Sequence, residues 1–203
     1  MKILLHMPHV SLKLPKSFYK GLLIDKNLVN KYNLIMSDVG IDTLFKDVKA
    51  YRIKAKYSRL FCDIEKFKND ELEVMSKYGQ GVIYTHTFDG LNFHTHDEKY
   101  KKMVMKYYDN YHKRLDNLVK RLLKNGETLL ILDCHSYSDK LADQFENGDY
   151  PDICIGIEED CYDGEILDKI INKIKELGYT YKINYPYKGS IIPNVIYNKK
   201  NTW

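Results

Sequence analysis

The stretch that decides the fold is the octapeptide Leu129-Leu130-Ile131-Leu132-Asp133-Cys134-His135-Ser136. Four consecutive aliphatic residues are typical of a buried central strand, which other elements cover on both faces. In open α/β sheets, ligands bind just outside the carboxyl ends of such strands. His135 therefore stands where a functional site is usually built, although a buried strand that ends in a polar loop explains the same residues equally well.

Strand and helix signals alternate on both sides of this stretch. We expect further strands at residues 3–5, 50–63, 81–85, 153–157 and 179–184. Helices are expected at residues 25–36, 41–48, 97–124 and 164–177, and the longest of them leads directly into the octapeptide. This alternation predicts an α/β fold, a three-layer α/β/α arrangement with a mixed, largely parallel central sheet. No linker or repeat divides residues 1–203, so we expect a single domain.

Composition narrows the class of protein. The chain has 203 residues, of which 44% are hydrophobic and 30% charged, as is usual for a globular protein. The net charge of +4 is spread along the sequence, so no nucleic-acid-binding surface is expected. The four cysteines form no CxxC pair, which indicates free thiols in a reducing compartment. No apolar stretch has the length of a signal peptide or a membrane span, so we expect a cytoplasmic protein without a membrane partner.

Two histidines, His9 and His135, each follow an expected strand. In a parallel sheet both would project at the same edge, and a nearby acid would complete a zinc site of two histidines and one carboxylate. Composition does not choose the acid, since several candidates are open: Asp38, Asp42, Asp63, Asp89 and Asp133.

Other chemistries are less well supported. Cys134 and Ser136 flank His135, but adjacent side chains point apart and do not make a catalytic pair. The sequence holds no nucleophile elbow around Ser136 and no glycine-rich phosphate loop. The alternating imidazoles of His94-Thr95-His96 lie in a polar loop and form a weaker metal candidate.

Eight short segments, in this order along the chain, resemble the N-formylglutamate amidohydrolase (deformylase-like) family. Each segment is weak alone, but their common order makes chance an unattractive explanation. The segments are Met7–Ser11, Ser37–Phe45, Tyr57–Glu65, Thr87–Gly90, Tyr111–Leu115, Asp133–Ser136, Pro151–Gly156 and Tyr187–Ser190. The resemblance implies a zinc-carboxypeptidase-like α/β/α fold and a zinc-dependent amidohydrolase acting on a small acidic N-acyl amino acid such as N-formylglutamate.

The same resemblance implies a metal site. Carried over residue by residue, His9, Asp38 and His135 are the implied zinc ligands, and Asp42, one helical turn from Asp38, is the alternative carboxylate. Asp133 is implied as an acceptor that holds an imidazole, although it also simply ends a strand. A bound zinc ion would activate water for attack on the amide.

The resemblance also implies a substrate site. Arg59 is the implied clamp for the substrate carboxylate, because a guanidinium fork matches a carboxylate, and Asp63 is its supporting partner. A structural ion pair at i, i+4 explains these two residues as well. His112 is implied to bind substrate or the developing oxyanion, with a surface histidine as the alternative.

Two departures from the family bear on activity. The family carries its general-base glutamate on a strand near the C-terminus, whereas no acid follows Glu176 in this sequence. We therefore expect the final strand of the family to be missing, and a weak or inactive relative that acts as a binding protein is the alternative function. Glu65-Lys66 also stands where the family favours Asn-Arg, which bears on whether the substrate is glutamate-like.

Overall fold

The computed structural model describes residues 1–142, 148–159 and 161–200. It divides into two compact units, Met1–Ser136 with Ile192–Trp203 and Tyr137–Ile191, and each unit is described here by itself. The expectation of a single domain over residues 1–203 stays a prediction.

The first unit is built on a parallel sheet of three strands. β1 (Lys2–Met7) lies between β2 (Tyr51–Lys54) and β3 (Leu129–Asp133), and both pairs are parallel. Leu4, Leu5 and Met7 of β1 are fully buried, as expected for a central strand. The apolar run at Leu129 is therefore confirmed as a strand, and it pairs with the N-terminal strand from which His9 follows.

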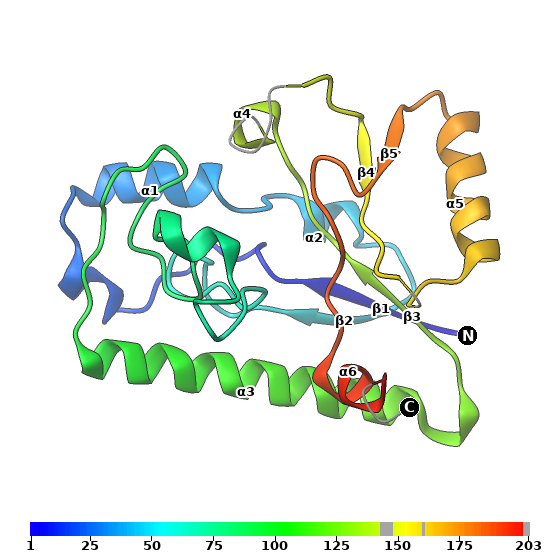
Figure 1. Cartoon of the computed structure of the whole chain (residues 1–203), viewed down its shortest axis with the longest axis horizontal. Coiled ribbons are helices and arrows are strands. Elements are labelled where there is room, and N and C mark those ends of the chain that lie inside the picture. Colours follow the sequence, from blue (N-terminus) through cyan, green and yellow to red (C-terminus); the bar gives the residue numbers. More distant parts are fainter. Residues whose placement is uncertain (143–147, 160, 201–203) are drawn as a thin grey trace. The chain divides into compact units, whose positions relative to one another are not determined.

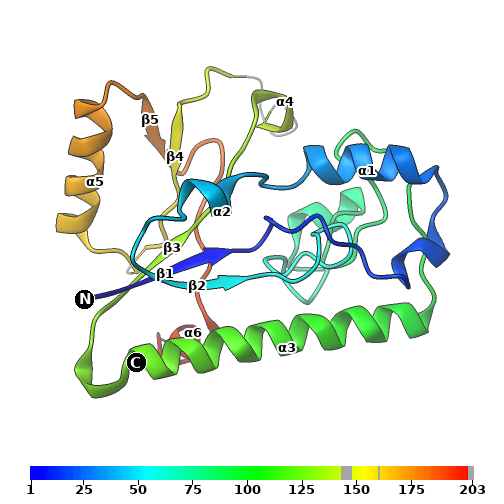
Figure 2. The same ribbon diagram turned by 180° about the vertical axis from the view of Figure 1, so that it is seen from behind.

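Helices lie on two sides of this sheet. α3 (Glu98–Leu122) runs along one side, and α1 (Lys26–Ile35) and α2 (Ile41–Leu44) lie on the opposite side (Figures 1 and 2). α6 (Asn194–Lys200) contacts α3, where the backbone N–H of Val195 donates to Asp116 at 3.1 Å. The protein is thus of mixed α/β class, and its parallel sheet and helices are compatible with a three-layer α/β/α arrangement.

The second unit holds a parallel pair of short strands. β4 (Ile153–Ile155) pairs with β5 (Tyr181–Ile183), and α5 (Gly164–Glu176) connects them. A short helix, α4 (Asp139–Ala142), precedes them. Both strands and the connecting helix occur where the sequence predicts them, but each strand is shorter than expected.

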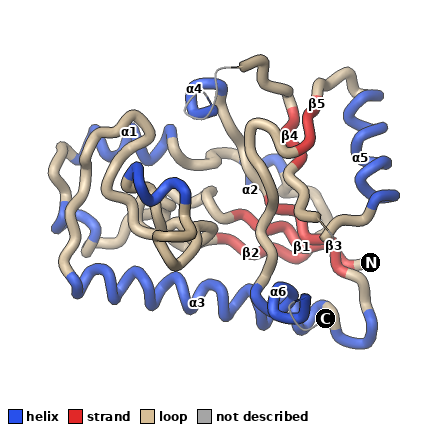
Figure 3. The backbone as a smooth tube through the Cα atoms, in the orientation of Figure 1, coloured by secondary structure: helices blue, strands red, loops and turns tan. Residues whose placement is uncertain are grey.

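One expected strand is wrong. Residues 81–85 form no strand and make only an isolated bridge between Gln80 and Tyr84, within a long loop-rich connection from β2 to α3 (Figure 3). A 3₁₀ helix, η2 (Val74–Tyr78), is the regular element there. The apolar residues of this segment are buried around one carboxylate instead: Val82 O accepts from Asp63 N at 2.9 Å, and Tyr84 OH donates to Asp63 at 2.8 Å.

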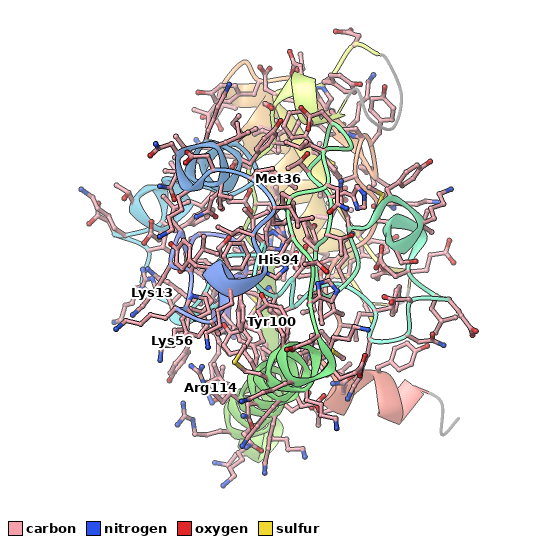
Figure 4. All side chains as sticks on the ribbon, turned by 90° about the vertical axis from the view of Figure 1, so that its left-hand side faces the viewer. Lys13, Met36, Lys56, His94, Tyr100 and Arg114 are labelled. Carbon is pink, nitrogen blue, oxygen red and sulfur yellow. The ribbon has the colours of Figure 1, made fainter. Side chains whose placement is uncertain are left out.

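The interior and the surface separate as the composition predicts. His94 and Tyr100 lie inside with ring centroids 5.0 Å apart, whereas Lys13 and Lys56 are exposed (Figure 4). All four cysteines are free thiols, as expected. In the part of the chain that the structure describes, no helix is both long and apolar enough to cross a membrane.

Candidate metal centre

The ends of β1 and β3 bring two imidazoles together. His9 follows β1 after Pro8, His135 follows β3, and their ring centroids lie 5.1 Å apart. The strands are parallel and adjacent, so both histidines leave the sheet at its carboxyl edge, as the sequence predicts. His9 is 3% exposed, so its ring is largely removed from water.

Asp38 lies against both imidazoles. Its Oδ2 is 3.0 Å from His135 Nδ1 and 3.5 Å from His9 Nδ1. The backbone N–H of Asp38 donates to His9 O at 3.0 Å, which fixes the loop after α1 beside the loop after β1. The alternative carboxylate, Asp42, is turned to a different partner, since Lys54 Nζ donates to it at 2.8 Å.

The charge state of Asp38 suits a ligand. Burial by itself raises the pKa of this carboxyl, but the hydrogen bond from His135 and the neighbouring His9 imidazole outweigh it and hold the pKa below its ordinary value. Asp38 is therefore ionised at neutral pH, as a metal-binding carboxylate must be.

The two nitrogens of His9 have different surroundings. Nε2 lies 2.9 Å from Asp63 Oδ1, whereas Nδ1 is buried and has no hydrogen-bond partner among the described residues. A proton on Nε2, donated to Asp63, leaves a lone pair on Nδ1. This is the arrangement by which carboxylates orient metal-binding histidines, so the residues present fit a divalent metal ion.

Sequence reasoning missed Glu65 as part of this centre. Its Oε2 is 3.3 Å from His9 Nε2, and its Oε1 is 3.3 Å from His135 Nε2. The ligand atoms of His9, Glu65 and His135 all lie within 4.8 Å of one another. The signal was present as the departure Glu65-Lys66, which was interpreted as a question of substrate rather than of the metal centre.

Asp133 also faces imidazoles. Its Oδ1 lies 2.6 Å from His6 Nδ1 and 3.3 Å from His135 Nε2. Burial raises the pKa of Asp133, but its hydrogen bonds with His135 and His6 outweigh burial and hold the pKa well below the usual value. Asp133 thus has the place expected of an acceptor that orients a histidine, and His6 is its second partner.

Arg59 and Asp63 form a buried ion pair. Arg59 Nε and Nη2 donate to Asp63 Oδ2 at 3.1 and 2.7 Å, and Tyr84 OH donates to the same oxygen at 2.8 Å. Burial raises the pKa of Asp63, but Arg59 and His9 outweigh it and hold the pKa well below its usual range. The Arg59 side chain is 23% exposed, and its Nη1 has only a 3.5 Å contact with Met36 O.

His112 is not in contact with these residues. Its Nε2 is 2.8 Å from Ile64 O, and its ring lies against Tyr108 with centroids 4.3 Å apart. It lines a separate hollow of about 660 Å³ together with Phe67 and Asn194. A catalytic or substrate-binding role for His112 stays a prediction. The weaker metal candidate His94 has its Nε2 on Phe18 O at 2.8 Å.

The fold and this cluster define an α/β protein with two histidines and a carboxylate at the carboxyl edge of a parallel sheet. The family model for N-formylglutamate amidohydrolase matches residues 1–203, so the chain belongs to that family. Comparison with curated proteins finds no match, and comparison with solved structures finds none. The family establishes an amidohydrolase role and a small-molecule substrate, whereas the zinc-carboxypeptidase-like fold stays a prediction.

Proposed function

We propose that the protein is a zinc-dependent amidohydrolase that cleaves the amide of a small N-acyl amino acid, N-formylglutamate being the first to test. His9, Asp38 and His135 hold the metal. The observation that carries the proposal is the unpartnered, buried Nδ1 of His9, which faces the same Asp38 oxygen as His135 Nδ1.

The spacing of these three groups supports a shared ion. Zinc binds histidine nitrogen and carboxylate oxygen at about 2.0–2.2 Å, so tetrahedral ligand atoms stand roughly 3.4 Å apart. The two Asp38 to histidine distances, 3.0 and 3.5 Å, bracket that separation. The alternative set, with Glu65 on the Nε2 side, requires His9 to use the nitrogen that already faces Asp63. We therefore favour the set that contains Asp38.

The residues around the centre bind and orient the substrate. When bound, the metal supplies polarisation of the amide carbonyl and activation of water. Arg59 presents Nη1 to the substrate carboxylate, while its other nitrogens are held by Asp63. Because Asp63 also receives Tyr84, the guanidinium is fixed before substrate arrives, which favours a single binding geometry.

The test measures formate release from N-formyl amino acids, beginning with N-formylglutamate. Protein stripped by a chelator is expected to be inactive, and restored zinc is expected to recover turnover. His135→Gln should remain inactive after zinc is added. His94→Gln is the matched control, because this buried histidine lies outside the centre, and it should recover as the wild type does. Turnover that survives chelation, or bound zinc without turnover on the whole substrate panel, would contradict the proposal.

A further inference from the structure

A second group of side chains lies beside the proposed metal centre, and it contains none of the three proposed ligands. It consists of His6, Glu65 and Asp133, whose ligand atoms all lie within 4.8 Å of one another. His6 of β1 stands opposite Asp133 of β3 in the register of the sheet. The two adjacent strands therefore hold two of these side chains in fixed positions.

We propose that His6, Glu65 and Asp133 bind a second divalent transition-metal ion next to the ion held by His9, Asp38 and His135. The function proposed above requires only one metal, so this inference goes beyond it. One imidazole nitrogen and two carboxylate oxygens are donors that zinc and manganese accept.

The distances show where this ion binds. His6 Nδ1 is 2.6 Å from Asp133 Oδ1 and 3.7 Å from Glu65 Oε1. The shorter distance is that of a hydrogen bond, so in the metal-free chain a proton lies between His6 and Asp133. Metal ligands bind deprotonated, and the incoming ion displaces this proton as the two ligand atoms move apart.

The two sites lie on opposite sides of one imidazole. His135 directs Nδ1 to Asp38, and its Nε2 is 3.3 Å from both Glu65 Oε1 and Asp133 Oδ1. The first ion uses the Nδ1 side, so Glu65 and Asp133 are not consumed by it. Both carboxylates therefore stay available for the second ion.

The charges of the network also favour two ions. Four carboxylates belong to it, namely Asp38, Asp63, Glu65 and Asp133, and their side chains are at most 18% exposed. Arg59 pairs with Asp63, while Lys66, next to Glu65, has its amine on Glu73 at 3.2 Å. Arg59 and one divalent ion bring three positive charges against four negative ones. Buried carboxylates are costly without compensating charge, and a second ion supplies it.

The test counts ions per chain. Protein is dialysed against zinc, freed of unbound metal, and measured by inductively coupled plasma mass spectrometry. The wild type and the control His94→Gln are expected to hold about two ions, and His6→Gln and His9→Gln about one each. Since His6 is fully buried, Glu65→Gln serves as a second variant against the new site, and near-ultraviolet circular dichroism checks that each variant is folded.

The outcomes separate this inference from the proposed function. One ion in the wild type, lost in His9→Gln and retained in His6→Gln, overturns the second site and leaves the proposed centre standing. One ion with the reverse pattern overturns the proposed centre and supports the second site. Two ions that persist in folded His6→Gln or Glu65→Gln also overturn the inference, and no bound ion overturns both.

Discussion

Asp63 is the residue on which most contacts of the site converge. Its carboxylate receives Arg59, Tyr84 and His9, and it is fully buried. The same three contacts fix the guanidinium that is proposed to bind substrate and the imidazole that is proposed to bind metal. A change at Asp63 therefore acts on stability and on the site together.

Asp63→Asn is expected to destabilise the fold by about 3 kcal/mol, because it leaves the Arg59 charge without its buried partner. The estimate lies at the low end for a buried pair, since the Arg59 side chain is 23% exposed. Urea unfolding of the metal-free protein measures it. Asp42→Asn is the matched control, because its ion pair with Lys54 is exposed, and it should cost less than about 1 kcal/mol. Equal losses in the two variants would contradict the account.

The pKa of Asp63 predicts an acid-sensitive fold. Because the folded-state pKa lies well below that of an unfolded Asp, the ionised carboxylate stabilises the fold above about pH 4. This contribution is lost as the pH falls below that value toward the folded-state pKa. The difference in unfolding free energy between the wild type and Asp63→Asn should therefore shrink between pH 7 and pH 3. A difference that does not change with pH would contradict the assignment.

Arg59→Lys tests the substrate clamp. Lysine keeps the positive charge beside Asp63 but lacks the guanidinium fork, so KM for an N-formyl amino acid is expected to rise roughly tenfold. Initial-rate kinetics measure KM. The corresponding substrate in which the carboxylate is an amide is the control, and its KM should be unchanged by the substitution. A KM that rises equally for both substrates would assign Arg59 a structural role only.

At this scale the sequence predicts the two histidines well and the carboxylates poorly. His9 and His135 each follow an expected strand, and parallel pairing brings such positions together. Asp38 was selected by resemblance alone, because it reaches the site through the loop after α1. Glu65 was missed, because nothing local shows where a residue of the loop after β2 points.

At the scale of elements, α3 is the helix that the sequence defines best. Val104, Tyr111, Leu115, Val119 and Leu122 are buried along one face, and the Asp97 side chain accepts from Tyr100 N at 2.7 Å at its N-terminus. Helical spacing and a capping residue are local signals, so they predict this helix correctly. The segment at 81–85 gave an equally apolar pattern but is a buried loop, since a short apolar run does not by itself reveal a strand partner.

Leu115→Ala is expected to cost about 3 kcal/mol of unfolding free energy, because Leu115 is fully buried and truncation leaves a cavity. Lys113→Ala, at an exposed position of the same helix, should change it by less than about 0.5 kcal/mol. Chemical denaturation measures both. Similar losses in the two variants would contradict the packing of α3 described here.

At the scale of the whole molecule, metal binding is coupled to folding. A ligand that binds only the folded chain stabilises it by about 2.7 kcal/mol at a hundredfold excess over Kd, roughly 5 to 10 °C in Tm for this length. Thermal unfolding with and without zinc measures the shift. The wild type should show it, whereas His135→Gln should show a smaller one. Identical shifts would place the stabilising metal elsewhere.

The most direct test of the metal centre is a crystal structure of the zinc-loaded protein with anomalous diffraction data collected at the zinc absorption edge. The account predicts an anomalous peak about 2.0–2.2 Å from His9 Nδ1, His135 Nδ1 and an Asp38 carboxylate oxygen. No peak at that position, or a peak held by His9 Nε2 and Glu65 without Asp38, would contradict it.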